Sequence, residues 1–149
     1  MSPRPTASLV VATYNWPEAL AAVLASVRRQ TVPPSEVVVA DDGSGEATRR
    51  VVEGAARDLP CPLVHVWHPD DGFKLAQIRN KAVARARGAY VLQIDGDMVL
   101  HPGFVGDHLA AAAPGFFVGG SRALLDAEAS RRVLEGGPLP GPLSPGVRN

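Results

Sequence analysis

Short apolar runs alternate along the chain with segments in which apolar residues recur every three or four positions. The runs are rich in β-branched residues, which is typical of strands buried on both faces of a parallel sheet. The other segments carry one apolar stripe each, as helices that pack on such a sheet do. The alternation predicts an α/β fold, a mostly parallel Rossmann-like sheet with helices on both faces. The predicted strands are residues 8–13, 36–40, 62–67, 90–94 and 116–119, and the predicted helices are residues 17–27, 46–59, 74–87 and 104–113.

Clusters of polar residues follow several of the predicted strands. They are residues 13–15, Asp41 with Asp42, residues 68–71, and the triplet Asp95, Gly96 and Asp97. The carboxyl ends of parallel strands lie along one edge of a sheet, and ligands of such folds bind beyond that edge. We therefore expect these clusters to build one binding site.

Asp95 and Asp97 place two negative charges at the end of one predicted strand. Such carboxylates repel each other unless a bound group neutralises them, and a hard divalent cation with a preference for oxygen ligands does so well. Gly96 between them lets the backbone approach a bound group closely. The triplet predicts a metal site, and a solvated turn with two acidic residues is the alternative.

The polar residues at the other strand ends suit a nucleotide. Asp41 and Asp42 could accept hydrogen bonds from ring N–H groups or ribose hydroxyls, or could serve as an N-terminal helix cap. Residues 13–15 could line a base pocket or form a turn. Arg79 and Lys81 could face a phosphate or be solvated charges. Sequence alone leaves both readings open for each of these residues.

The composition narrows the choice of partners. The chain has 15 basic and 15 acidic residues, so its formal net charge is zero and no global field favours nucleic acid or an anionic membrane. A single cysteine excludes an internal disulfide. No apolar run approaches the ~20 residues that span a bilayer, and no secretory signal pattern opens the chain. These features predict a cytoplasmic location and leave open a peripheral association with the inner membrane.

The end of the chain differs from the rest. Residues 136–146 contain four prolines and four glycines, without apolar periodicity. Such a stretch is not expected to pack. The sequence thus predicts one partial domain at residues 1–135 and a flexible Gly/Pro-rich tail at residues 136–149.

Four motifs in combination resemble family 2 glycosyltransferases, whose fold is called GT-A. They are residues 8–15, residues 38–44, Arg79 with Asn80, and residues 94–98. The run from residue 70 to residue 98 is most similar to the chondroitin-polymerase-like and galactosyltransferase-like members. The resemblance spans roughly residues 8–122. It implies metal-dependent transfer of a sugar from a nucleotide-sugar donor, expected to be a UDP-sugar, to a saccharide or glycoconjugate acceptor with inversion.

The resemblance also implies which residues surround the base of the donor. Thr13, Tyr14 and Asn15 are expected to lie beside it. Asp42 is expected to bind the uracil ring, and Asp41 is expected to lie nearby. All five positions follow from the match to the family's motifs and remain expectations at this point.

The same resemblance assigns the diphosphate and metal side of the site. Arg79 is expected near the base or the diphosphate. Asp95 is expected to hold the ribose or to bridge to the metal through water, with Gly96 beside the nucleotide. Asp97 is expected to ligate Mn²⁺ or Mg²⁺.

Two parts of the family's site have no match in this sequence. Family members carry a catalytic carboxylate, often in an acidic pair, and a further metal-ligand histidine beyond the matched region. Asp126, Glu128 and Glu135 follow that region in a predicted helical stretch, and none of them is assigned as the base. We expect the base beyond residue 149, so that this chain alone binds the donor without useful transfer.

Three other functions compete with the transferase. A HAD-like phosphohydrolase would use Asp95 and Asp97 as nucleophile and acid, but its acidic pair normally follows the first strand. A receiver-like signalling module would use an acidic pocket like Asp41 with Asp42, but that pocket also starts at the first strand. A non-catalytic nucleotide-sugar-binding fragment differs from the transferase only in lacking a base.

Overall fold

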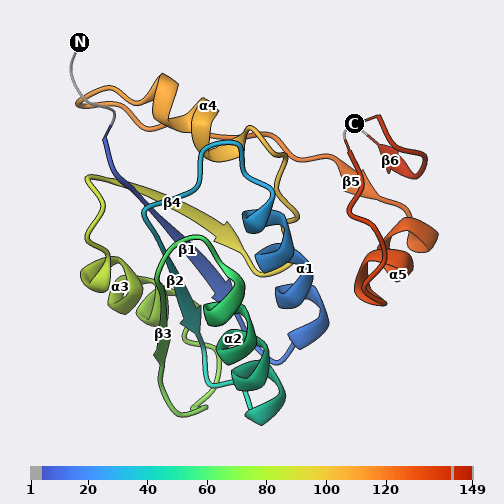
Figure 1. Cartoon of the computed structure of the whole chain (residues 1–149). Helices are drawn as coiled ribbons and strands as arrows, with labels where there is room; N and C mark the ends of the chain where they lie inside the picture. The colour runs from blue at the N-terminus through green and yellow to red at the C-terminus, as the bar shows by residue number, and fades with distance from the viewer. Residues whose placement is uncertain (1–4, 142, 149) are drawn as a thin grey trace.

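The computed structural model describes residues 5–141 and 143–148, and its centre is a parallel sheet. The sheet has four strands in the order β3-β2-β1-β4. Their bounds are β1 (Ala7–Thr13), β2 (Glu36–Asp41), β3 (Leu63–Trp67) and β4 (Tyr90–Asp95). The helices are α1 (Pro17–Arg28), α2 (Glu46–Asp58), α3 (Leu75–Arg85), α4 (Phe104–Ala111) and α5 (Ala127–Leu134). The predicted α/β fold is confirmed, with each of the first four strands and helices in its expected place (Figure 1).

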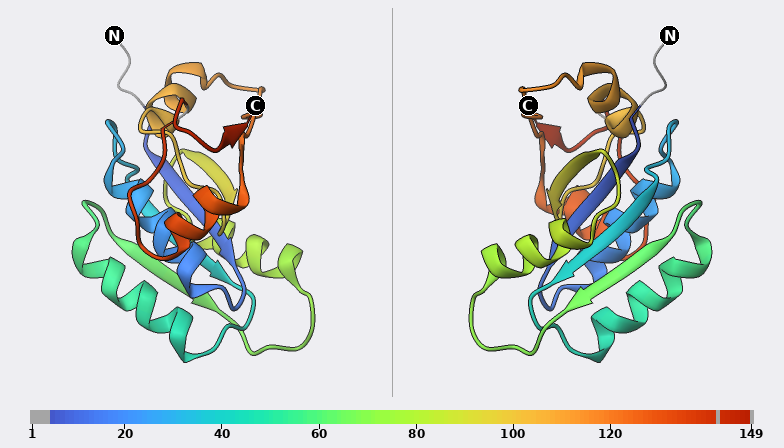
Figure 2. Two further views of the ribbon diagram at one scale, coloured as in Figure 1. Left: turned by 90° about the vertical axis from the view of Figure 1, so that its right-hand side faces the viewer. Right: turned by 90° about the vertical axis from the view of Figure 1, so that its left-hand side faces the viewer.

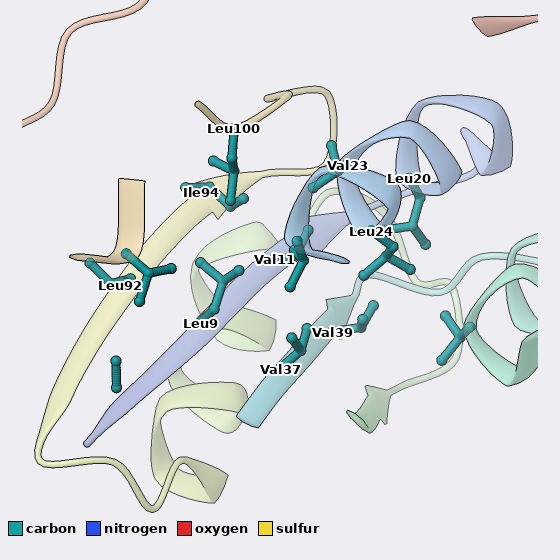
Figure 3. Close-up of a cluster of buried hydrophobic side chains, with 14 of the residues drawn as sticks. Leu9, Val11, Leu20, Val23, Leu24, Val37, Val39, Leu92, Ile94 and Leu100 are labelled. Atoms are coloured by element: carbon teal, nitrogen blue, oxygen red, sulfur yellow. The ribbon is translucent and has the colours of Figure 1, made fainter. Parts of the chain in front are cut away.

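Helices cover both faces of the sheet (Figures 1 and 2). On one face, Leu9 and Val11 of β1 pack against Leu20 and Val23 of α1, as Figure 3 shows. On the other face, the neighbouring side chains of the same strands contact Ile78 and the rest of the buried stripe of α3. Because both faces are buried, the strands need apolar residues at consecutive positions rather than in alternation. This is why β1 and β2 appear in the sequence as unbroken apolar runs.

The register brings the carboxyl ends of the strands together at one edge. Ala12 of β1 pairs with Ala40 of β2 on one side and with Asp95 of β4 on the other. One residue further along, Thr13 pairs with Asp41. The acidic clusters that follow β2 and β4 are therefore separated by only one strand.

The predicted strand at residues 116–119 is wrong. These residues form no strand, and Phe116 and Phe117 are 77% and 94% exposed. A run of apolar residues becomes a buried strand only where a neighbouring strand and a helix cover it, and no described segment does so here. The strand that follows α4 is instead β5 (Leu124–Leu125), which pairs antiparallel with β6 (Val147–Arg148).

β6 lies inside the segment that was predicted to be a flexible tail. Besides the β5–β6 pairing, the amide of Asp126 donates a hydrogen bond to the carbonyl of Gly146. A short ladder thus ties part of this segment to the start of α5. The domain boundary at residue 135 stays a prediction. In the part of the chain that the structure describes, no helix is long and apolar enough to cross a membrane.

Candidate functional site

A pocket of about 240 Å³ opens at the carboxyl edge of the sheet, between the ends of β1 and β4 and the loop that precedes α3. The apolar part of its lining includes Trp16, Phe73 and Leu75. Its polar part brings together six of the residues that the sequence singled out: Thr13, Tyr14, Asp42, Asp95, Gly96 and Asp97. Clusters that are up to about eighty residues apart in sequence therefore form one site, as expected from the parallel sheet.

Asp95 and Asp97 are the open carboxylates of this pocket. Both are exposed, and Asp95 forms an ion pair with Arg79 on α3. Gly96 lies between them against β1, where an added Cβ would lie 2.6 Å from the carbonyl oxygen of Ala12. Only glycine fits that close approach, so the residue shapes the turn that presents the two carboxylates.

Asp41 is not part of the pocket lining, although it follows the same sequence pattern. Its side chain is buried, accepts a hydrogen bond from His65 Nε2 at 2.8 Å and accepts another from the amide of Ser44 at 2.8 Å. Burial alone would raise the pKa of Asp41, but these hydrogen bonds outweigh it and the pKa lies below its ordinary value. Asp41 thus holds the turn after β2 in place.

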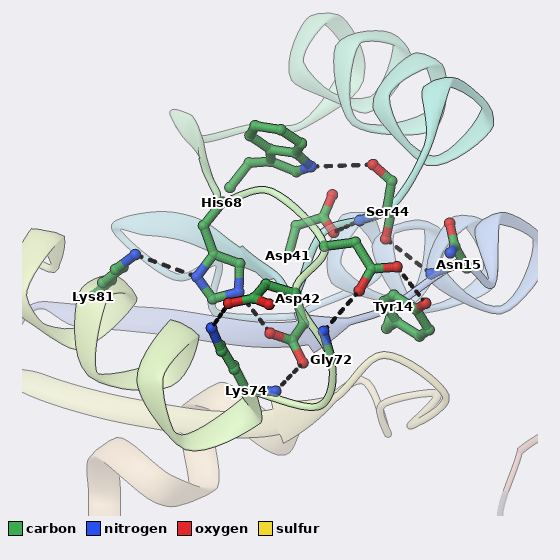
Figure 4. A network of polar contacts seen from close by, with 12 residues as sticks. Tyr14, Asn15, Asp41, Asp42, Ser44, His68, Gly72, Lys74 and Lys81 are labelled. Carbon is green, nitrogen blue, oxygen red and sulfur yellow. Dashed lines mark hydrogen bonds and ion pairs between the residues drawn. The ribbon is translucent and has the colours of Figure 1, made fainter.

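Asp42 is also buried, with 4% of its surface exposed, yet it borders the pocket. One carboxylate oxygen accepts a hydrogen bond from His68 Nε2 at 2.6 Å. The other oxygen accepts one from the amide of Lys74, at the start of α3, at 2.9 Å. The carboxylate is therefore fixed from two sides while it faces the pocket (Figure 4).

Tyr14 and Asn15 occupy the turn between β1 and α1 and have different contacts. The hydroxyl of Tyr14 donates to Asp70 at 2.8 Å, and this hydrogen bond to a negative charge raises the pKa of Tyr14. Asn15 has a φ of 44°, and its side-chain oxygen accepts from the amide of Gly45 at 2.9 Å. Its own amide donates to Ser44 Oγ at 2.8 Å. Tyr14 lines the pocket, whereas Asn15 joins the turns after β1 and β2.

Sequence reasoning missed the partners of the acidic pair. His65 lies on β3, and His68 directly follows this strand. His68 had the same signal as the acidic clusters, a polar residue after an apolar strand, but its partner could not be known before the strand order. Trp16 and Phe73 were also missed as pocket residues, because exposed aromatic residues beside turns have no distinctive spacing.

The three carboxylates after the matched region have structural contacts. Asp126 Oδ1 accepts from the amide of Ala129 at 2.8 Å and caps α5. Glu128 pairs with Arg132 at 2.8 Å, and Glu135 pairs with Arg131 at 3.0 Å. None of the three lines the pocket at the strand ends. The identity of the catalytic base stays open.

The pocket offers hard oxygen ligands but an incomplete set. Among the described residues, no group of three or more histidine, cysteine or acidic side chains is arranged to hold a metal ion. Mg²⁺ is commonly bound by one or two carboxylates together with substrate phosphates and water. Asp95 and Asp97 fit that mode, because they are exposed, adjacent to one glycine, and border the same pocket.

Comparison with known families decides what kind of protein this is. The family model of glycosyl transferase family 2 matches residues 8–134. The chain belongs to this family. A curated relative, chondroitin synthase from Escherichia coli, is 35% identical over 107 residues, which cover 71% of this chain and 15% of the relative. The chain spans at most 30% of the length of the first curated relatives that it matches.

Solved structures of family members have the same GT-A fold. A mannosyltransferase from Pyrobaculum calidifontis, solved in complex with GDP-Man and Mn²⁺, has a TM-score of 0.68 and 26% identity, covering 89% of this chain and 39% of that one. TarS 1-349 from S. aureus, solved in complex with UDP-GlcNAc, has a TM-score of 0.60 and 25% identity, covering 79% of this chain and 39% of that one. The similarity to family 2 glycosyltransferases in the sequence motifs is thus confirmed.

Proposed function

We propose that this chain carries the donor site of a metal-dependent glycosyltransferase that moves a sugar from a UDP-sugar to a saccharide or glycoconjugate acceptor. The observation that carries the proposal is the meeting of Asp42, Asp95 and Asp97 in one pocket, beside Thr13 and Tyr14 at the end of β1. The buried carboxylate of Asp42 suits a hydrogen bond to the nucleobase of the donor. The two exposed carboxylates, Asp95 and Asp97, suit a metal ion that is bound together with the diphosphate.

The solved relatives support this class of ligand. The mannosyltransferase is in complex with a nucleotide sugar and Mn²⁺, and TarS is in complex with a UDP-sugar. The family match also favours a transferase over the phosphohydrolase and receiver alternatives, since it covers residues 8–134. A non-catalytic donor-binding protein of this family differs from our proposal only in turnover.

In the proposed reaction, Asp97 and Asp95 would hold Mn²⁺ or Mg²⁺, which would supply positive charge to stabilise the departing diphosphate. Arg79, which pairs with Asp95, would orient that carboxylate near the diphosphate. The nucleobase of the donor would lie against Thr13 and Tyr14, and its ring N–H would donate a hydrogen bond to Asp42. These residues bind and orient the donor so that its anomeric carbon faces the acceptor.

Transfer with inversion also needs the acceptor hydroxyl to lose its proton to a positioned base. We assign no residue of this chain to that role. The chain alone is therefore expected to bind the donor and to hydrolyse it slowly to UDP and free sugar, with water as the acceptor. It is not expected to show turnover that depends on a saccharide acceptor. Incubation with Mn²⁺, UDP-sugars and candidate saccharides checks this. Acceptor-dependent turnover at ~1 per second or faster would place the base within these 149 residues.

Calorimetry tests the binding part of the proposal. UDP is titrated into the chain in Mn²⁺ buffer and in a buffer with a metal chelator, after circular dichroism has shown that the chain is folded. We expect binding that is tighter with Mn²⁺, because a bound cation would offset the negative charges of the two carboxylates and the diphosphate. Equal affinity in the two buffers would reject metal-dependent binding, and no affinity in either would reject the donor site.

A further inference from the structure

Three side chains form a line from the surface of α3 to the pocket (Figure 4). The Nζ atom of Lys81 lies 3.2 Å from His68 Nδ1, and His68 Nε2 lies 2.6 Å from Asp42 Oδ1. Lys81 is exposed, whereas His68 and Asp42 are 7% and 4% exposed. The proposed donor site makes direct use of Asp42 only, so the other two residues need an explanation.

The chemistry of the end groups decides the state of the ring between them. An ammonium group has three donors and no acceptor, so Lys81 can only donate to His68 Nδ1. That nitrogen must then carry a lone pair, and the ring proton lies on Nε2. There it donates to Asp42, which as a carboxylate only accepts. The contacts thus select one neutral tautomer of His68.

This arrangement leaves Asp42 as an acceptor toward the pocket. Its two oxygens have about four lone-pair positions, and His68 and the Lys74 amide use one on each oxygen. The donors come from the end of β3 and the start of α3, so the carboxylate cannot rotate without losing one of them. Asp42 therefore presents a fixed negative acceptor to a ligand.

We propose that His68 and Lys81 are positioning residues that make the site discriminate between pyrimidine bases through Asp42. Uracil has an N–H group at ring position 3, whereas cytosine has a lone pair there. A fixed carboxylate accepts from the first and repels the second. The inference rests on the proposed nucleotide-sugar function and specifies which residues outside the pocket determine the preference for its base.

A purely structural role for His68 makes a different prediction. If His68 only fills space beside Asp42, its loss would weaken binding of all nucleotides alike. If it positions Asp42, its loss would weaken UDP selectively. The ratio of UDP to CDP affinity separates the two roles, because the two ligands share the ribose, the diphosphate and the ring size.

The test measures dissociation constants for UDP and CDP in Mn²⁺ buffer with the whole chain and four variants. His68→Leu removes both the donor and the acceptor of the ring. His68→Gln keeps an N–H for Asp42 and an oxygen for Lys81, and thus serves as the conservative rescue. Lys81→Met removes the charge that selects the tautomer. Arg85→Met, on an exposed position of the same helix, controls for the loss of a positive charge.

We expect the unchanged chain and Arg85→Met to prefer UDP by about 10- to 150-fold, the range of one hydrogen bond to a charged group. His68→Leu should reduce the preference to about threefold or less, Lys81→Met should reduce it partly, and His68→Gln should keep most of it. An unchanged ratio in His68→Leu, with both affinities reduced alike, would overturn the positioning role while leaving the donor site intact. Absence of binding by either nucleotide would overturn the proposed function itself.

A spectroscopic measurement tests the tautomer without any ligand. Long-range ¹H–¹⁵N correlation spectra distinguish a ring protonated at Nε2 from one protonated at Nδ1. The contacts predict the Nε2–H form of His68 in the unchanged chain and a mixture of forms in Lys81→Met. An Nδ1–H ring in the unchanged chain would overturn the inference, whatever the nucleotide affinities.

Discussion

The acidic pair after β2 and the two carboxylates after β4 follow similar apolar strands but reach opposite states. Asp41 and Asp42 are 1% and 4% exposed and accept hydrogen bonds from two histidines and two amides. Asp95 and Asp97 are exposed. β2 lies inside the sheet, whereas β4 is one of its two edge strands among the described residues. The neighbours of a strand thus decide whether its terminal carboxylates become a rigid support or remain open to a ligand.

Gly43→Ala should have the largest effect, because it disrupts the turn that holds the buried pair, Asp41 and Asp42. Gly43 has a φ of 100°, and an added Cβ would lie 2.5 Å from the Cα of Asp70. The positive φ costs about 1–2 kcal/mol and the contact adds about 1–3 kcal/mol, so unfolding in urea should show a loss of about 2–5 kcal/mol. The matched control is Gly115→Ala, with a φ of 81° and no atom within 4 Å. Equal losses in the two variants would show that the Asp70 loop does not pack on Gly43.

Asp97→Ala tests the exposed pair, Asp95 and Asp97, and should affect the binding of UDP rather than the stability of the fold. Loss of a charged ligand to the metal should weaken UDP in Mn²⁺ by about 10- to 150-fold, with unfolding unchanged to within about 0.5 kcal/mol. Calorimetry and urea unfolding measure the two effects. Asp58→Ala, an exposed acid at the end of α2, is the control and should change neither. A large loss of stability in Asp97→Ala would contradict our view that the buried pair supports the fold whereas the exposed pair serves binding.

Asp41→Asn should lower stability by about 1–3 kcal/mol at neutral pH, since the variant keeps the shape but loses the charged acceptor. The folded-state pKa of Asp41 lies below its ordinary value of 3.8, so its contribution is present above that pH. The contribution is lost as the pH falls below 3.8 through the lower folded value. The gap between the variant and the unchanged chain in urea unfolding should therefore stay constant above about pH 5 and narrow as the pH falls below 3.8. A constant gap would show that the Asp41 charge contributes nothing.

Arg79→Met should have the smallest effect on stability. The ion pair of Arg79 with Asp95 is partly exposed, with 33% and 53% of the two side chains accessible. Exposed pairs contribute about 0–1 kcal/mol, so the melting temperature should change little. UDP affinity should fall if Arg79 orients Asp95 toward the metal. Unchanged UDP affinity would show that Arg79 has no part in binding, and that the exposed part of the site consists of Asp95 and Asp97 alone.

Much of the fold follows from local pattern, because a sheet covered on both faces requires consecutive apolar residues in its strands. The valine-rich segments of β1 and β2 were therefore predictable. The prediction failed at residues 116–119, where no segment that the structure describes covers the apolar residues. Pairing with a distant segment, as in β5 with β6, has no local signal at two residues per strand.

The site was predictable to the level of clusters but not of contacts. The order of elements was enough to bring Asp42 and Asp95 to one edge of the sheet. That Asp41 turns away from the pocket toward His65 depends on the register of β2 with β3, where Val39 pairs with His65 and Asp41 with Trp67. The register between two strands that lie more than twenty residues apart in sequence cannot be predicted from either strand alone. The roles of the individual site residues in binding remain predictions.

The most direct test of the open pair is electron paramagnetic resonance of Mn²⁺, because the sharp signal of the hydrated ion is lost when the ion is bound. The signal is recorded with the chain, with UDP, with both, and with both in the Asp97→Ala variant. Our account predicts that chain and UDP together remove more signal than the sum of their separate effects, and that Asp97→Ala abolishes this excess. An excess of the same size in the variant, or no excess with the unchanged chain, would contradict a metal held between Asp97 and the diphosphate.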